Sequence, residues 1–211
     1  MSIIKLNNQA VKNATAFGSI TGLGSMIFIK KLTASSSATL SFVDGSNGVV
    51  LDDTYKEYVF TFNNIHVATN MADFSFNMST DSGSNYNVAK TSTYFKAQHQ
   101  GSTGNYGSLD YFTSGDLAQG TGFQRLTEAL YNGDTASMSG YLHLFNPSSD
   151  TFVKHFISDV NHTGEDGSGN NYSYESFVAG YGNTTSAINA VRFQMSSGNI
   201  DSGVIKLYGV S

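Results

Sequence analysis

The stretch SGNIDSGVIKLYGVS (197–211) contains the pattern that decides the fold. Side chains alternate between the two faces of an extended chain, so Ile205 and Leu207 fall on one face and their neighbours fall on the other. The preceding stretch VRFQMS (191–196) alternates in the same way. Ser, Gly, Asn and Asp, which favour turns, separate the two runs. The pattern predicts a closing hairpin whose final strand pairs inside a sheet.

The same alternation recurs from Met26 onward. Eight further strand candidates share it, and they are residues 25–32, 37–45, 57–65, 72–80, 90–99, 140–147, 151–160 and 174–182. The first two are expected to form an early hairpin. About nine or ten short strands with at most one short helix predict an all-β fold, an antiparallel jelly-roll-like β-sandwich over residues 26–211. Residues 1–25 have no clear period, and we interpret them as an N-terminal arm with a lead-in strand.

Two stretches leave alternatives open. Residues 100–120 are rich in Gly and Ser with isolated aromatic residues, and they contain either a further strand or a functional loop. In GFQRLTEALYNG (122–133), Phe123, Leu126 and Leu130 have helical spacing, and the alternation expected of a strand is poorer. The spacing therefore favours a short helix in the second stretch.

The composition excludes several classes of function. Charged residues make up only 13% of the 211 residues, against about 25% in a typical domain. The net charge of -5 and the lack of a basic cluster argue against a nucleic-acid partner. With no cysteine, disulfides and thiolate chemistry are excluded. The start MSIIKLNNQ (1–9) lacks the apolar core of a signal peptide, and no apolar run approaches membrane-span length, so we expect neither export nor membrane insertion.

Metal sites are not predicted. DGSGNN (166–171) supplies oxygen ligands at alternate positions, but Asn171 stands where a calcium loop needs Gly and Phe177 where it needs Glu. We interpret this stretch as a turn between strands. His143 and His155 lie in strands that could be neighbours, and we interpret them as partly buried strand residues and not as metal ligands. No cofactor is expected.

Catalytic residues are not predicted either. The chain lacks the local motif of a nucleophilic serine, although a triad assembled in space is not excluded by that. An acid pair for sugar hydrolysis could come from Asp73, Glu128, Asp159 or Glu175, and nothing singles out two of them. We therefore expect a protein that is not an enzyme.

Loop tyrosines are candidates for contact. The chain has 12 Tyr and no Trp, and sugars stack on flat aromatic faces. The candidates lie in or beside loops rich in Gly, Ser and Asn, and they are Tyr86, Tyr106, Tyr111, Tyr172 and Tyr174. Alternatively, these rings cover loop bases or pack between subunits.

Six stretches resemble a group of virion proteins from tailed phages of marine and cyanobacterial hosts. They are MSIIKLNNQ (1–9), FNNIHVAT (62–69), STDSGSNYN (79–87), GYLHLFNPSS (140–149), FVAGYGNTTSAINAVRFQMSSGNI (177–200) and GVIKLYGV (203–210). The resemblance covers most of the chain and not residues 97–122. It implies a structural protein of the virion, made in the host cytoplasm, with a short N-terminal segment before a β-rich domain. It supplies no catalytic residues.

Together these observations predict a head-surface decoration (cement) or fibre protein. It would act through contacts with its own copies, as a homo-oligomer and most simply a trimer, and with capsid or tail proteins. In one hypothesis Ile3, Ile4 and Leu6 form an assembly arm that adds a strand to a neighbouring subunit or the capsid; in the other this strand lies on its own domain. The alternative function is a tail fibre or receptor-binding module that holds host-surface glycan through Tyr106, Tyr111, Tyr172 and Tyr174.

Overall fold

The computed structural model describes residues 26–101 and 106–211, and within these ranges the chain forms strands and no helix. The proposed arm residues Ile3, Ile4 and Leu6 lie outside the described residues. The twelve strands are β1 (Met26–Ser37), β2 (Thr39–Val43), β3 (Glu57–Val67), β4 (Phe74–Ser79), β5 (Lys90–Gln100), β6 (Gly107–Tyr111), β7 (Gln124–Arg125), β8 (Met138–Phe145), β9 (Lys154–Glu165), β10 (Asn171–Gly182), β11 (Ala190–Met195) and β12 (Ile200–Val210).

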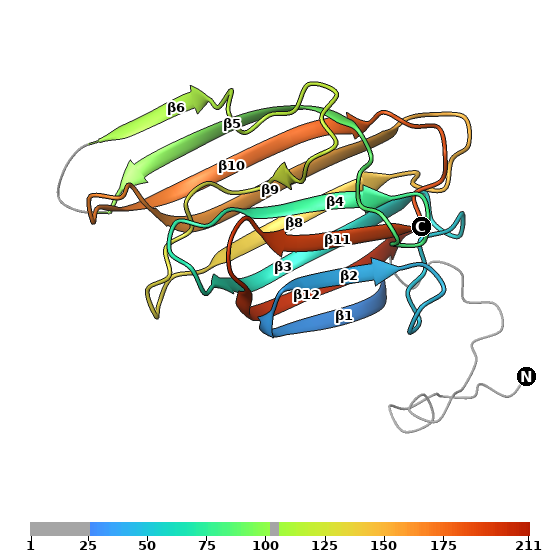
Figure 1. Cartoon of the computed structure of the whole chain (residues 1–211), viewed down its shortest axis with the longest axis horizontal. Coiled ribbons are helices and arrows are strands. Elements are labelled where there is room, and N and C mark those ends of the chain that lie inside the picture. Colours follow the sequence, from blue (N-terminus) through green and yellow to red (C-terminus); the bar gives the residue numbers. More distant parts are fainter. Residues whose placement is uncertain (1–25, 102–105) are drawn as a thin grey trace, which may run out of the picture.

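The strands form two antiparallel sheets, which confirms the all-β sandwich. The large sheet has eight strands in the order β1-β12-β3-β8-β9-β10-β5-β6, and the small sheet has four in the order β2-β11-β4-β7. Figure 1 shows the small sheet in front of one part of the large sheet, while β9, β10, β5 and β6 extend beyond it. One face of the large sheet is therefore covered, and its opposite face has no second layer over it among the described residues.

Most successive strands alternate between the two sheets. The exceptions are the pair β5–β6 and the run β8–β9–β10, which stay within the large sheet; every other strand lies in the opposite sheet from the one before it. This alternation favours the jelly-roll connectivity, in which Greek keys wrap two facing sheets. The jelly-roll description itself remains a prediction.

Both predicted hairpins are wrong. β11 and β12 lie in opposite sheets, and so do β1 and β2. The chain crosses between sheets at Ser36 and at Asn199, whose side-chain amide donates a 3.0 Å hydrogen bond to the carbonyl of Ser36. An alternating strand needs one buried face, and either sheet of a sandwich provides one, so the pattern is the same for a hairpin and a crossing. The final strand is paired on both sides, with β1 and β3, as predicted.

The predicted helix at 122–133 is also wrong. This stretch contains β7 and irregular backbone that bonds to β4 and its approach: the amides of Leu126 and Thr127 donate to the carbonyl of Phe74, and the amide of Leu130 donates to Ala72. Ala129 has a φ of 49°, which a helix does not allow. Pairing with a distant strand satisfies the backbone groups that a helix would have paired locally.

Two other predictions are confirmed. The stretch 100–120 does contain a further strand, β6, which pairs with β5 at the edge of the large sheet. The turn at Asp166 joins β9 to β10, and its carboxylate accepts hydrogen bonds from the amides of Ser168 (2.8 Å) and Asn170 (3.2 Å). These bonds define a side-chain-stabilised turn.

Candidate functional site: the open face of the large sheet

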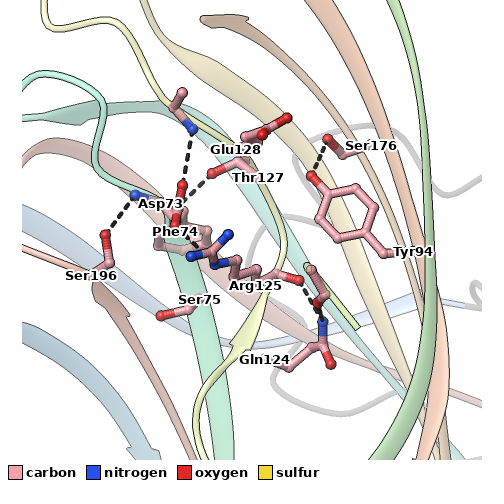
Figure 2. A network of polar contacts seen from close by, with 12 residues as sticks. Asp73, Phe74, Ser75, Tyr94, Gln124, Arg125, Thr127, Glu128, Ser176 and Ser196 are labelled. Carbon is pink, nitrogen blue, oxygen red and sulfur yellow. Dashed lines mark hydrogen bonds and ion pairs between the residues drawn. The ribbon is translucent and has the colours of Figure 1, made fainter. Parts of the chain in front are cut away.

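Two of the four acid candidates belong to a buried polar network (Figure 2). The Asp73 carboxylate accepts a 2.9 Å hydrogen bond from the amide of Ala129 and forms an ion pair with Arg125 at 3.0 Å. Glu128 forms an ion pair with Lys96. Both carboxylates already have cationic partners, so this network holds the connection 112–137 in place and offers no free acid or base.

The same network continues toward the large sheet. The side-chain amide of Gln124 donates to the carbonyl of Gly115 at 2.8 Å, and its oxygen accepts from the Ser92 hydroxyl at 2.6 Å. The Tyr94 hydroxyl lies 2.7 Å from the Ser176 hydroxyl (Figure 2), and burial raises the pKa of this phenol. The polar groups of these side chains are therefore paired within the domain.

His162 is buried in the same region and is neutral. Its Nε2 lies 2.8 Å from the carbonyl oxygen of Glu128, so Nε2 is the atom that carries the proton. Burial lowers the pKa of His162 to about 4, and its ring stacks on Tyr174. An imidazole that stays neutral and enclosed is a packing residue here.

The other two acids, Asp159 and Glu175, lie together on the open face. Glu175 accepts a 2.9 Å hydrogen bond from the Asn161 amide, and burial together with the neighbouring Asp159 raises the pKa of Glu175. The Asp159 carboxylate accepts a 3.4 Å hydrogen bond from the Tyr141 hydroxyl. Both acids are therefore held by neighbouring side chains of this face.

A band of mostly aromatic side chains crosses the open face and is interrupted by Asp159. On neighbouring strands, Tyr141 of β8 lies opposite Asp159 of β9. Phe177 of β10 lies between Asp159 and Phe95 of β5. The Phe177 and Phe95 rings stack at 4.9 Å. The band ends on β6, where Tyr111 and Leu109 are 55% and 71% exposed. These side chains project into solvent at the unpacked face of an extended sheet.

Beside this band the face is hollowed. A groove of about 480 Å³ lies over β5, β10 and β9. Ala179 lies between Thr93 and Ile157 in the ladder, and Tyr181 lies between Thr91 and His155. Because Ala179 is shorter than its neighbours, it forms the floor, and the neighbours form the walls. The lining is mostly apolar, which suits an apolar group of a partner.

No family model matches the chain, and comparisons with curated proteins and with solved structures find no match.

The four tyrosines of the predicted contact loop separate into two pairs. Tyr106 is 52% exposed and Tyr111 is 55% exposed, both at the β6 edge. Tyr172 and Tyr174 lie within β10, where they are only 9% and 5% exposed. A sugar could stack on the first pair and could not reach the second. Tyr106 and Tyr172 nonetheless touch edge to face, with ring centroids 6.2 Å apart.

Tyr86, the fifth candidate among the loop tyrosines, packs on the outer side of the small sheet. The Arg192 guanidinium lies 3.9 Å from its ring centroid, and its hydroxyl is buried. This ring covers a loop base, which was the alternative interpretation of the loop tyrosines.

The two histidines interpreted as strand residues lie on the neighbouring strands β8 and β9, where His143 is opposite Ile157 and not opposite His155. His143 hydrogen-bonds to the Glu57 carboxylate, and His155 contacts Tyr181 at a ring distance of 6.0 Å. Among residues 26–101 and 106–211 no three metal-ligating side chains come together. The same part of the chain has no helix long and apolar enough to cross a membrane.

Sequence reasoning missed the open face. Its signal is a pair of consecutive apolar residues, because neighbours in a strand point to opposite faces. Phe156–Ile157, Phe177–Val178 and Tyr94–Phe95 each place one residue in the core and the other on the open face. A strand that is apolar on both faces indicates a second contact surface beyond the core.

Proposed function

We propose that this chain is a non-enzymatic structural protein of a phage virion, acting as a head-surface decoration or fibre protein through protein–protein contacts. The observation that carries the proposal is the open face of the large sheet, with its apolar band and groove. Contiguous exposed apolar surface of this kind is typical of protein interaction sites. The resemblance to virion proteins of tailed phages supplies the setting.

The polar groups elsewhere support the same proposal. Asp73 and Glu128 are paired with cations, and His162 is enclosed and neutral. Asp159 and Glu175 accept hydrogen bonds from Tyr141 and Asn161. Each of these groups has a structural partner, which suits a rigid platform that presents a surface. An eight-stranded sheet backed by a second layer is such a platform, since its strands are connected by continuous hydrogen-bonded ladders.

Glycan binding is the second candidate, and the exposure of Tyr106 and Tyr111 favours it. Both rings lie at the β6 edge and are more than half exposed. A receptor-binding module would hold a sugar on these two rings alone, because Tyr172 and Tyr174 are buried. Binding on a glycan array that disappears in Tyr106→Ala and Tyr111→Ala variants would establish this candidate.

Labelling of intact particles tests the proposed function. Purified phage particles that carry this gene product should bind an antibody against the domain at regular, countable positions on the head or on fibres. Particles that lack the protein altogether would refute the proposal. Turnover of a polysaccharide by the purified chain would show that it is an enzyme instead.

The arm hypothesis has its own test. A variant without residues 1–20 should keep the circular dichroism spectrum of a folded β domain and lose incorporation into particles. Its matched control is the full chain with Ile3, Ile4 and Leu6 each replaced by Val, which keeps an apolar β-forming arm. Normal incorporation of the truncated variant would contradict an assembly role for these residues.

A further inference from the structure

We propose that copies of this chain bind one another by inserting Phe152 of one copy into the open-face groove of another. This inference rests on the proposed contact function of the open face and names the partner. The groove is the hollow over β5, β10 and β9 that has Ala179 as its floor. Phe152 lies in the turn between β8 and β9 and is 68% exposed.

The turn presents Phe152 in a defined position. The Ser149 hydroxyl accepts hydrogen bonds from the amides of Phe152 at 3.0 Å and of Thr151 at 3.2 Å. Pro147 lies in the same turn, and its ring restricts the backbone further. A large apolar side chain on an ordered turn loses little entropy on binding, which is how contact residues gain affinity.

A buried lysine fixes the backbone of this residue. Lys154 is fully buried, and its ammonium group donates to the carbonyl of Phe152 at 2.6 Å. It also reaches the carbonyls of Thr184 and Thr185 at 3.4 and 3.3 Å, so it ties two loops together. Burying a cation is costly unless its hydrogen bonds are satisfied, and these three bonds offset that cost. They also hold the backbone of Phe152, whose side chain is exposed, in one position.

The groove matches such a side chain in size and chemistry. At about 480 Å³ it is in the range of pockets that enclose most of a bound group. Its walls are methyl groups and aromatic edges from Ile157, Thr93 and Tyr181. Neither Tyr181 nor His155 forms a side-chain hydrogen bond with the described residues, so both polar tips are available at the rim. An aromatic side chain of a partner can therefore pack against the floor of the groove while a polar group beside it in the partner hydrogen-bonds at the rim.

The polar groups beside Phe152 and the groove favour a second copy as the occupant. The Asp150 carboxylate, a hydrogen-bond acceptor, is exposed two residues before Phe152, and the Tyr181 hydroxyl, which can donate, lies at the groove rim. Phe152 and His155 are three residues apart, so the Phe152 side chain and the groove lie at the same end of the sheet.

The available area is also that of a stable interface. Eight strands spaced about 4.8 Å apart and about 30 Å long make a face of about 1,000 Å², and a standard interface covers about 800 Å² per partner. Each chain carries both Phe152 and the groove. A two-fold dimer would therefore contain the Phe152–groove contact twice, and a closed head-to-tail ring of three chains would contain it three times. Both arrangements place the same residues in contact.

Cysteine crosslinking tests this contact directly, since the chain has no cysteine of its own. The Phe152→Cys, Ala179→Cys double variant should form disulfide-linked oligomers under mild oxidation. Within one chain Ala179 lies opposite Ile157, about 10 Å along β9 from its first residue Lys154, and Phe152 precedes that strand. A disulfide needs Cα atoms within about 7 Å. The control is Phe152→Cys, Ser168→Cys, because Ser168 is exposed at the opposite end of β9. The control and both single variants should stay uncrosslinked.

Sedimentation of single variants measures the contribution of each part. The wild-type chain should be an oligomer, and Phe152→Ser should weaken association at least about 30-fold, as removal of a central contact residue does. Ala179→Arg should weaken it similarly by filling the floor. Thr151→Ser, in the same turn, should leave it unchanged. Circular dichroism checks that each variant is folded, and Phe152→Ser removes only an exposed side chain.

The outcomes separate this inference from the proposed function. A wild-type chain that sediments as a monomer at all concentrations, or an oligomer that both variants leave intact without crosslinks, would overturn the inference. In either case antibody labelling of particles would still support the virion role. Conversely, a crosslinked oligomer that is absent from particles would retain the contact and refute the virion role.

Discussion

The small sheet and the connection 112–137 cover neighbouring parts of the same face of the large sheet, and they do so with different chemistry. Beneath the small sheet the core is aromatic: Phe193 touches the rings of Phe42, Phe60, Phe62, Phe74 and Phe76. Beneath the connection it is polar: Ser92, Tyr94, His162 and Ser176 are buried there.

The difference follows from what each cover requires. A sheet pairs its own backbone groups, so only side chains face its partner, and these can all be apolar. An irregular connection leaves amides and carbonyls without partners, and burying them unpaired is costly. The large sheet supplies those partners: the Ser92 hydroxyl accepts from the amide of Leu117 at 2.9 Å, and His162 donates to the carbonyl of Glu128 at 2.8 Å. The polarity of a core therefore depends on the layer above it.

The largest expected effect is in the aromatic part. Phe193→Ala should lower the free energy of unfolding by about 3–5 kcal/mol, because it empties the centre of a cluster that cannot collapse around the gap. Urea denaturation measures the loss. Phe95→Ala removes the same side chain from the open face and should cost much less. Equal losses at the two positions would show that the aromatic cluster is not the main core.

A smaller effect is expected in the polar part. Gln124→Ala should cost about 2–3 kcal/mol, because it removes the acceptor of the buried Ser92 O–H and the side-chain donor to the carbonyl of Gly115. The same denaturation series measures it. Gln98→Ala, at a half-buried position of β5 where the amide has no hydrogen bond within the described chain, is the matched control. If both cost the same, the network does not stabilise the cover.

The polar part should also respond to pH. The pKa of His162 is about 4 in the folded chain and 6.5 in the unfolded chain. Between these values only the unfolded chain binds the proton, so the free energy of unfolding falls as the pH falls from 6.5 to 4. The wild-type chain should lose roughly 2 kcal/mol over this range in excess of a His162→Gln variant.

Thermal unfolding at a series of pH values measures this difference. His99→Gln replaces an exposed histidine and should leave the pH dependence of the wild-type chain unchanged. Parallel curves for the wild-type chain and the His162 variant would mean that this imidazole is charged when folded.

The smallest effect on stability is expected at the open face. Ile157→Thr keeps a β-branched residue at an exposed position and should change the free energy of unfolding by no more than about 0.5 kcal/mol. Measured by sedimentation, the same variant should nevertheless weaken association, because Ile157 lines the groove. A large loss of stability would place this residue in the core and would remove the distinction between covered and open faces.

Part of this organisation follows from local sequence. Alternation in stretches such as 57–65 and 174–182 predicts strands with a buried face, and those strands are present. The Asp166 turn is likewise a local feature. The candidate surface is indicated only by consecutive apolar residues such as Phe156–Ile157. That the second residue lies on an open face of the sheet is recognised only once the strand's place in the sheet is known.

What the sequence determined by itself is the class of structure: many strands, each with one apolar face, joined by turns and stacked as a sandwich. Tertiary structure alone decided which sheet each strand joins, that residues 122–133 pair with β4 instead of forming a helix, and that Phe152 and the groove lie at one end of the sheet. The physical reason is range. Alternation is a property of one strand and its immediate neighbours, whereas a crossing such as Ser36–Asn199 depends on residues 163 positions apart.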